Sequence, residues 1–150
     1  MKVIYNYAAG PEFAQVLGAL TSVGLDVAVC PESDDAQLFD LLRDADVLWH
    51  CLRPVDARLI DAAPRLRLVQ KIGVGVNTID LEAAKARNIA VCNLPGANSR
   101  AVAEMTLLLM LACLRRLREL DANVRREGGW LKSWAMQDGF GELGGRTVGL

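Results

Sequence analysis

The sequence lacks a surplus of charge of either sign. Its 17 Lys and Arg residues are balanced by 18 Asp and Glu residues, for a formal net charge of −1. Binding to nucleic acid usually shows itself as a basic excess that neutralises phosphates, and none is present. With 52% hydrophobic residues, the composition indicates a folded domain and not a disordered chain.

A long apolar run is also absent. The longest one, residues 105–114 (MTLLLMLACL), has about half the length of a membrane-spanning helix. The first ten residues, MKVIYNYAAG, are too polar and carry too short an apolar run for a signal peptide. We therefore expect a cytoplasmic protein that makes no contact with a membrane or with nucleic acid.

Paired cysteines of the C-x-x-C type are missing as well. Cys30, Cys51, Cys92 and Cys113 lie far apart in the chain, each beside apolar residues. We interpret them as reduced core thiols, with metal ligation as the alternative. We expect no metal site.

Short apolar runs alternate with helical patterns through the first two thirds of the chain. The predicted strands cover 2–7, 25–30, 46–51, 66–73 and 89–95, and the predicted helices cover 11–24, 33–45, 55–64 and 80–88. Near-continuous apolar strands in a βαβα order are typical of an α/β fold in which helices cover both faces of a parallel sheet.

Several helix boundaries carry sequence signals. Pro11 and Gly24 mark the start and end of the first helix. Ser33 and Asp80 are predicted N-caps, and Asn88 is a predicted left-handed terminus.

A different pattern begins near Asn98. Apolar residues recur every three or four positions as far as Arg126, which predicts one long helix over 98–126. Its first half is apolar nearly all round, as in a helix buried between two bodies. A core helix of a single domain is the alternative. The segment 126–145 is predicted to be an irregular connection, and 146–150 (RTVGL) the start of a strand.

The segment 71–80 (KIGVGVNTID) places two glycines between a predicted strand and helix. Ligands of open α/β sheets bind at the carboxyl ends of strands. The consecutive amides of Val74 and Gly75 can form a nest for a carboxylate. A simple tight turn is the alternative interpretation.

Two further segments carry polar residues that a ligand could use. The N-terminus of the long helix, which Asn98 or Ser99 can cap, could attract a polar group, although simple capping is the interpretation that the sequence alone favours. Glu104 needs a partner, and Arg100 is the candidate. His50, the only histidine, stands beside Arg53 without a complete catalytic set, which favours a structural role.

In order and spacing, these segments resemble the D-isomer-specific 2-hydroxyacid dehydrogenases. The similarity covers nearly the whole chain and is strongest over 63–117, 128–130 and 141–150. It implies a flavodoxin-like parallel sheet forming a substrate domain at 1–97. It also implies an inter-domain and dimerisation helix at 98–126 and, by 150, the first strand of a truncated Rossmann domain.

The resemblance also implies roles for individual residues. Val74 and Gly75 match the positions whose amides hold the substrate carboxylate, and Arg53 and Asn98 match others that approach the substrate. Ser99 and Val102 match positions that line the nicotinamide pocket. The implied cofactor is NAD or NADP, the substrate is a small 2-oxo or 2-hydroxy acid, and the assembly is a homodimer.

The catalytic Arg, Glu and His of this family would all lie beyond Leu150, as would the phosphate-binding turn. We therefore expect the 150-residue chain to be part of an oxidoreductase and inactive alone. The sequence does not identify the acid that is the substrate, and it does not distinguish NAD from NADP as the cofactor. The alternatives are a non-catalytic binding or dimerisation module and a co-regulator relative that works by protein recognition.

Overall fold

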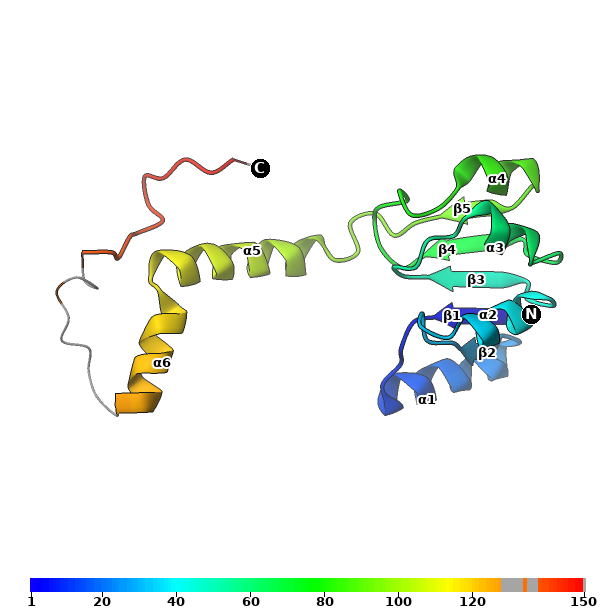
Figure 1. Ribbon diagram of the computed structural model, residues 1–150, viewed down its shortest axis with the longest axis horizontal. Helices are drawn as coiled ribbons and strands as arrows, with labels where there is room; N and C mark the ends of the chain where they lie inside the picture. The colour runs from blue at the N-terminus through cyan, green and yellow to red at the C-terminus, as the bar shows by residue number, and fades with distance from the viewer. Residues whose placement is uncertain (128–133, 135–137, 150) are drawn as a thin grey trace. The chain divides into compact units, whose positions relative to one another are not determined.

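The computed structural model describes residues 1–127, 134 and 138–149 (Figure 1). The chain divides into two compact units, Met1–Ala97 and Asn98–Leu150. The first is an α/β unit, and residues 98–127 of the second contain helices α5 and α6. None of the helices described has both the length and the apolar character needed to span a membrane.

The first unit is built on one parallel sheet of five strands in the order β2-β1-β3-β4-β5 (Figure 1). The strands are β1 (Lys2–Asn6), β2 (Asp26–Val29), β3 (Val47–His50), β4 (Leu68–Lys71) and β5 (Ala90–Cys92). This order is the flavodoxin-like one. The predicted fold class is therefore confirmed for the first unit.

The connections between the strands are helical. They are α1 (Pro11–Ala19) with the 3-10 helix η1 (Leu20–Val23), α2 (Asp35–Leu42), α3 (Ala57–Asp61) and α4 (Leu81–Ala86). The helix predicted over 11–24 is thus α-helical only to Ala19, and a tighter turn completes it. Gly24, at φ 84°, ends that turn in the left-handed conformation that glycine adopts without steric cost.

Aspartate side chains cap three of these helices. Asp34, Asp56 and Asp80 each accept a hydrogen bond from the backbone amide three residues later, at 2.9 Å. The predicted N-cap at Asp80 and the predicted left-handed conformation of Asn88 (φ 55°) are both confirmed. The predicted cap at Ser33 was wrong, because the next residue, Asp34, performs that function.

The core lies between one face of the sheet and helices α2, α3 and α4. Ile4, Leu48 and Val69 are adjacent in register across β1, β3 and β4, and each is at most 2% exposed. They belong to one buried cluster with residues of the three helices, among them Leu38, Leu42, Leu59, Ile60 and Ala84. Helix α1 packs on the opposite face, where the rings of Tyr5 and Phe13 meet edge to face with 5.4 Å between their centres.

Over residues 98–127, the second unit contains two helices where one was predicted. Helix α5 spans Ser99–Leu114 and helix α6 spans Leu117–Glu127. Between them Arg116 takes a left-handed conformation (φ 50°), and its carbonyl accepts the amides of Glu119 and Leu120 at the start of α6. The prediction of one continuous helix was therefore wrong at this junction, which contains no glycine or proline to signal a break.

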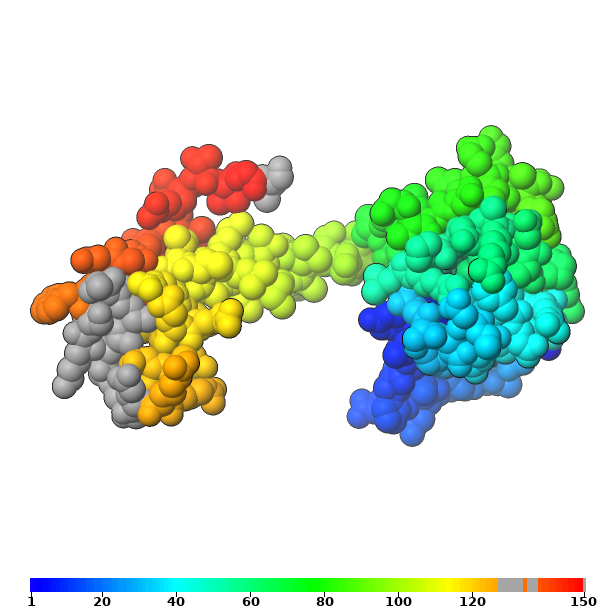
Figure 2. Space-filling view, viewed as in Figure 1, coloured from blue at the N-terminus to red at the C-terminus, as the bar shows by residue number. Residues whose placement is uncertain are grey.

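Helix α5 buries none of its residues within the chain, and Figure 2 shows its exposed surface. The predicted strand at 146–150 is not formed over Arg146–Gly149, and Leu150 lies outside the described residues. A strand requires a hydrogen-bonded neighbour, and none of the described segments pairs with these residues. Much of the predicted connection 126–145 also lies outside the described residues.

Candidate functional site

The loop between β4 and α4, residues 72–78, follows the carboxyl end of a central strand (Figure 1). Its first half is tied to both neighbouring strands. The amide of Ile72 donates to the carbonyl of His50 at 2.8 Å, and the carbonyl of Gly73 accepts from Leu94 at 2.9 Å. The Asn93 side chain donates to the Val74 carbonyl at 2.8 Å.

The far end of the loop is tied as firmly. The carbonyl of Thr78 accepts the Val55 amide at 2.8 Å, and its hydroxyl lies 2.8 Å from Nε2 of His50. Asp80, which caps α4, also donates its amide to the carbonyl of Val55 at 2.9 Å. Contacts from β3, β5 and the Val55 segment thus hold the loop in one conformation.

The predicted substrate residues Val74 and Gly75 lie at the exposed tip of this loop. No residue in the described part of the chain accepts a hydrogen bond from either of their amides. A Cβ added at Gly75 would lie 2.9 Å from Oδ1 of Asn77, so any larger residue here would displace the Asn77 side chain. Consecutive amides without acceptors can bind an anion.

A buried polar cluster lies beneath the loop. His50 is fully buried, and its Nδ1 has no hydrogen-bond partner among the described residues. Nζ of Lys71 lies 3.4 Å from Nε2 of His50 and also donates to the Cys51 carbonyl. Burial, and then the neighbouring Lys71 ammonium, lowers the pKa of His50 to about 4, so the imidazole is neutral at physiological pH.

Arg53, the third predicted substrate residue, is engaged by helix α2. Its guanidinium forms an ion pair with Asp35 and lies over the ring of Phe39, with 5.9 Å between the guanidinium carbon and the ring centre. The hydrogen bond from Arg53 lowers the pKa of the Asp35 carboxyl. The guanidinium of Arg53 is therefore already paired within the first unit.

Sequence reasoning missed several residues that shape the site. Glu32 accepts the amides of Leu52 and Arg53 at 2.7 and 2.5 Å, and Lys71 and Asn93 contact the loop itself. One signal was available for Lys71, because it is a charged residue at the end of a predicted buried strand. Asn93 likewise directly follows β5 at the carboxyl edge of the sheet.

The remaining predicted residues, Asn98, Ser99 and Val102, belong to the second unit. Asn98 occupies the N-cap position of α5, but its side chain makes no capping hydrogen bond. The capping interpretation was therefore wrong for Asn98. Val102 is exposed, and Arg100 pairs with Glu104 at 3.1 Å as predicted, with both side chains in solvent.

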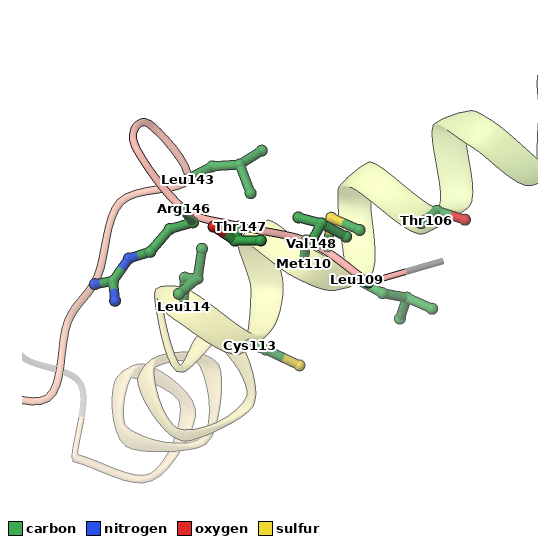
Figure 3. A pocket seen from close by; sticks show the side chains of 10 residues that line it. Thr106, Leu109, Met110, Cys113, Leu114, Leu143, Arg146, Thr147 and Val148 are labelled. Carbon is green, nitrogen blue, oxygen red and sulfur yellow. The ribbon is translucent and has the colours of Figure 1, made fainter.

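An apolar groove runs along α5 within the second unit (Figure 3). Leu109, Met110 and Leu114 of the helix line one side, and Leu143, Thr147 and Val148 line the other. Apart from Arg146, no charged side chain lines it, and it contains none of the predicted site residues. The groove therefore offers mainly apolar contact.

The cysteines do not all lie in a core. Cys30 is buried and Cys51 half-buried, but Cys92 and Cys113 are exposed, so the prediction of core thiols was wrong for the last two. All four are free thiols, and burial raises the pKa of Cys30 and Cys51. Within the described residues, no three His, Cys, Asp or Glu side chains are grouped to hold a metal.

Comparison with known proteins gives a consistent result. Residues 3–146 match the family model described as D-isomer specific 2-hydroxyacid dehydrogenase, catalytic domain. A glyoxylate reductase from Korarchaeum cryptofilum is 37% identical over 116 residues, which is 75% of this chain and 34% of that protein. A D-3-phosphoglycerate dehydrogenase from Mycobacterium leprae is 36% identical over 78% of this chain and 22% of its own length.

A solved structure shares the fold. The NAD-dependent formate dehydrogenase from Staphylococcus aureus, in complex with NAD, superposes with a TM-score of 0.71 at 27% identity. The match covers 87% of this chain and 43% of that one. The chain thus spans less than half the length of each of these three proteins.

Proposed function

The chain belongs to the D-isomer specific 2-hydroxyacid dehydrogenase family, and from this premise we propose that it forms the substrate-binding part of an NAD- or NADP-dependent oxidoreductase. The enzyme would interconvert a small 2-oxo acid and a D-2-hydroxy acid by hydride transfer. We assign residues 1–97 to the substrate domain and residues 98–150 to the inter-domain helices and the start of the nucleotide-binding domain.

One observation carries this proposal. The loop 72–78 is held at both ends, while the amides of Val74 and Gly75 at its tip have no acceptor among the described residues. A rigid pair of unsatisfied donors can bind a carboxylate without paying for loop ordering at that moment. The substrate would be oriented there by its carboxylate, with its 2-oxo group directed away from the loop.

The cofactor would supply or accept the hydride when bound. Ser99 and Val102 are exposed in the first turn of α5, which is compatible with the proposed role in lining a nicotinamide pocket. Arg53 and Asn98 are proposed to approach the substrate. For Arg53 this requires release from Asp35, whereas the Asn98 side chain is not occupied by a cap.

Titration of the ¹⁵N-labelled chain with oxamate, an unreactive 2-oxo acid analogue, tests the proposal. We expect saturable NMR shifts centred on the amides of Val74 and Gly75. Gly75→Val should weaken binding at least about tenfold, because the branched side chain crowds Asn77 and covers the amides. Gly18→Val is the matched control, since a Cβ at Gly18 meets nothing within 4 Å. Shifts spread over other surfaces would contradict the assignment.

We also propose that the protein forms a homodimer through α5 and α6. Support comes from α5, where Met105, Leu108 and Leu109 are each more than half exposed. Apolar patches of this kind mark association surfaces. Light scattering should show concentration-dependent dimers that Leu109→Glu disrupts. Val23→Glu places the same charge at an exposed apolar residue of the first unit and should leave the dimers intact. A monomer at high concentration would contradict this proposal.

The exposed α5 also favours a second candidate function, a non-catalytic binding module or co-regulator relative. This second function would be favoured if light scattering showed dimers while the NMR signals of Val74 and Gly75 did not shift on addition of oxamate. We further propose a cytoplasmic location, because all four cysteines are free thiols, which is usual in a reducing compartment.

A further inference from the structure

The carboxyl end of β3 carries a second pair of consecutive amides, which we call the β3 nest. The amides of Leu52 and Arg53 both donate to one carboxylate oxygen, Oε1 of Glu32, at 2.7 and 2.5 Å. Glu32 lies between β2 and α2 and is half-buried. Two successive amides that converge on one oxygen form an anion-binding concavity. Here the bound anion is the chain's own Glu32 side chain.

Hydrogen bonds, and not an ion pair, hold the Glu32 carboxylate. No Lys or Arg in the described part of the chain forms an ion pair with it, and the guanidinium of Arg53 pairs with Asp35. Hydrogen bonds from amides to a carboxylate are charge-assisted and stronger than those between neutral groups. The β3 nest is therefore filled, whereas the amides of Val74 and Gly75 have no acceptor among the described residues.

The loop that contains the β3 nest lies beside the loop 72–78. Where the two loops begin, the amide of Ile72 donates to the carbonyl of His50 at 2.8 Å. Where they end, the amide of Val55 donates to the carbonyl of Thr78 at 2.8 Å. The two loops thus share both anchors, and they follow adjacent parallel strands, which lie about 4.8 Å apart. The filled pair of amides and the open pair are neighbours at one edge of the sheet.

We propose that Glu32 is a specificity-determining residue, because it fills the β3 nest and so restricts the substrate to a 2-oxo acid whose side chain carries no negative charge. The inference rests on the proposed function, in which the substrate carboxylate binds to Val74 and Gly75. A second carboxylate or a phosphate on the substrate would find the neighbouring amides already occupied. It would also meet the negative charge of Glu32, and like charges repel each other strongly where little water screens them.

Loss of the Glu32 side chain should have the opposite effect. The amides of Leu52 and Arg53 would then lack an acceptor, and a second anionic group of the ligand could replace the missing carboxylate. A purely structural role of Glu32 leads to a different expectation, because a loosened loop would weaken the binding of every 2-oxo acid alike. The relative affinity for two ligands that differ only in charge therefore distinguishes the two roles.

Two 2-oxo acids with the same carbon skeleton provide this comparison. Of these, 2-oxopentanoate ends in a methyl group and 2-oxoglutarate in a carboxylate, and each is titrated into the ¹⁵N-labelled chain. We expect wild type to bind 2-oxopentanoate at least about fivefold more tightly. In Glu32→Ala this preference should fall at least about fivefold, and 2-oxoglutarate should shift the amides of Leu52 and Arg53. Asp40→Ala removes an exposed carboxylate of α2 and should keep the wild-type preference.

The outcomes distinguish the inference from the function on which it rests. Binding at Val74 and Gly75 with the same preference in wild type and Glu32→Ala would overturn the inference and leave the function standing. A wild type that binds both acids equally would do the same. No wild-type response of these two amides to either acid would overturn both.

A second variant keeps the test decisive if Glu32→Ala does not fold. Glu32→Gln retains an oxygen that accepts hydrogen bonds from the β3 nest, but it no longer repels an anion. The preference for 2-oxopentanoate should again fall, because the neutral amide is more easily displaced by a carboxylate than Glu32 is. An unchanged preference in Glu32→Gln would overturn the inference.

Discussion

The two units use apolar residues in opposite ways. In the first, Ile4, Leu48 and Val69 meet helices α2, α3 and α4 and are at most 2% exposed. In the second, the 16 residues of α5 include five leucines and two methionines, but none of them is buried within the chain. The comparison teaches that apolar content predicts burial only where the chain itself supplies the opposing surface.

The same contrast applies to polar groups. The first unit caps three helices with aspartates and holds the loop 72–78 by hydrogen bonds from both sides. In the second, Asn98 makes no capping bond, and the ion pairs Arg100–Glu104 and Arg125–Asp121 lie in solvent. Exposed pairs of this kind contribute little to stability. The first unit is therefore held together by buried contacts, whereas none of the described residues of the second unit is buried.

The largest expected effect tests this contrast with one leucine from each unit. Leu48→Ala should destabilise the first unit by about 2–5 kcal/mol, because it opens a cavity in a packed core. Leu109 lies in the second unit and is 56% exposed, so Leu109→Ala should change the free energy of unfolding of the first unit by less than about 0.5 kcal/mol. Urea unfolding followed through amide resonances of the first unit measures both. Equal losses would mean that the two units fold as one.

The next effect is a pH dependence confined to the first unit, which holds the single histidine. The pKa of His50 is about 4 in the folded state, against 6.5 ordinarily, so the unfolded chain takes up the proton first as the pH falls. The contribution of His50 to the free energy of unfolding is therefore most favourable above pH 6.5, and it declines as the pH falls from about 6.5 to 4. We expect a loss of about 2 kcal/mol at pH 5 relative to pH 7.5.

His50→Gln is the control for that pH dependence, because glutamine does not titrate. The difference between wild type and His50→Gln in urea unfolding should shrink or reverse as the pH is lowered from 7.5 to 5. A difference that stays constant across this range would show that His50 keeps an ordinary pKa in the folded protein.

The smallest effect compares two residues at helix N-termini. Asp80→Ala should cost about 1 kcal/mol, because it removes the acceptor for the Ala83 amide. Asn98→Ala should cost close to nothing, because Asn98 makes no capping bond. Hydrogen exchange should become about fivefold faster in the first turn of α4 and stay unchanged in that of α5. Faster exchange in both would mean that Asn98 caps α5 in solution.

Much of the first unit was predictable because its signals are local. The cap at Asp80 and the left-handed Asn88 follow from side chains that act within one turn of their own position. The parallel sheet followed from apolar runs and intervening helices, which require burial on both faces. Boundaries were less accurate: the helix over 11–24 changes its hydrogen-bonding pattern after Ala19, five residues before the glycine that was predicted to end it.

The candidate site was only partly predictable. Val74 and Gly75 could be named because two glycines in a strand-to-helix loop are visible in the sequence. The contact of Asn93 with Val74 could not be predicted, because it joins residues 19 positions apart. The contacts of Lys71 with His50 and of Glu32 with Arg53 each join residues 21 positions apart, and no local pattern reveals them. The pairing of Arg53 with Asp35 is likewise a contact across the fold.

By itself, the sequence determined the family, the βαβα order, the parallel sheet and the position of the glycine-containing loop between the fourth strand and the helix that follows it. These features depend on composition, spacing and local backbone preference. Only the tertiary structure decided that α5 and α6 separate at Arg116, that Arg53 faces Asp35, and that a buried Lys71 lies beside Gly73. The reason is physical: hydrogen bonding and burial between distant segments depend on the folded arrangement, and no local pattern encodes them.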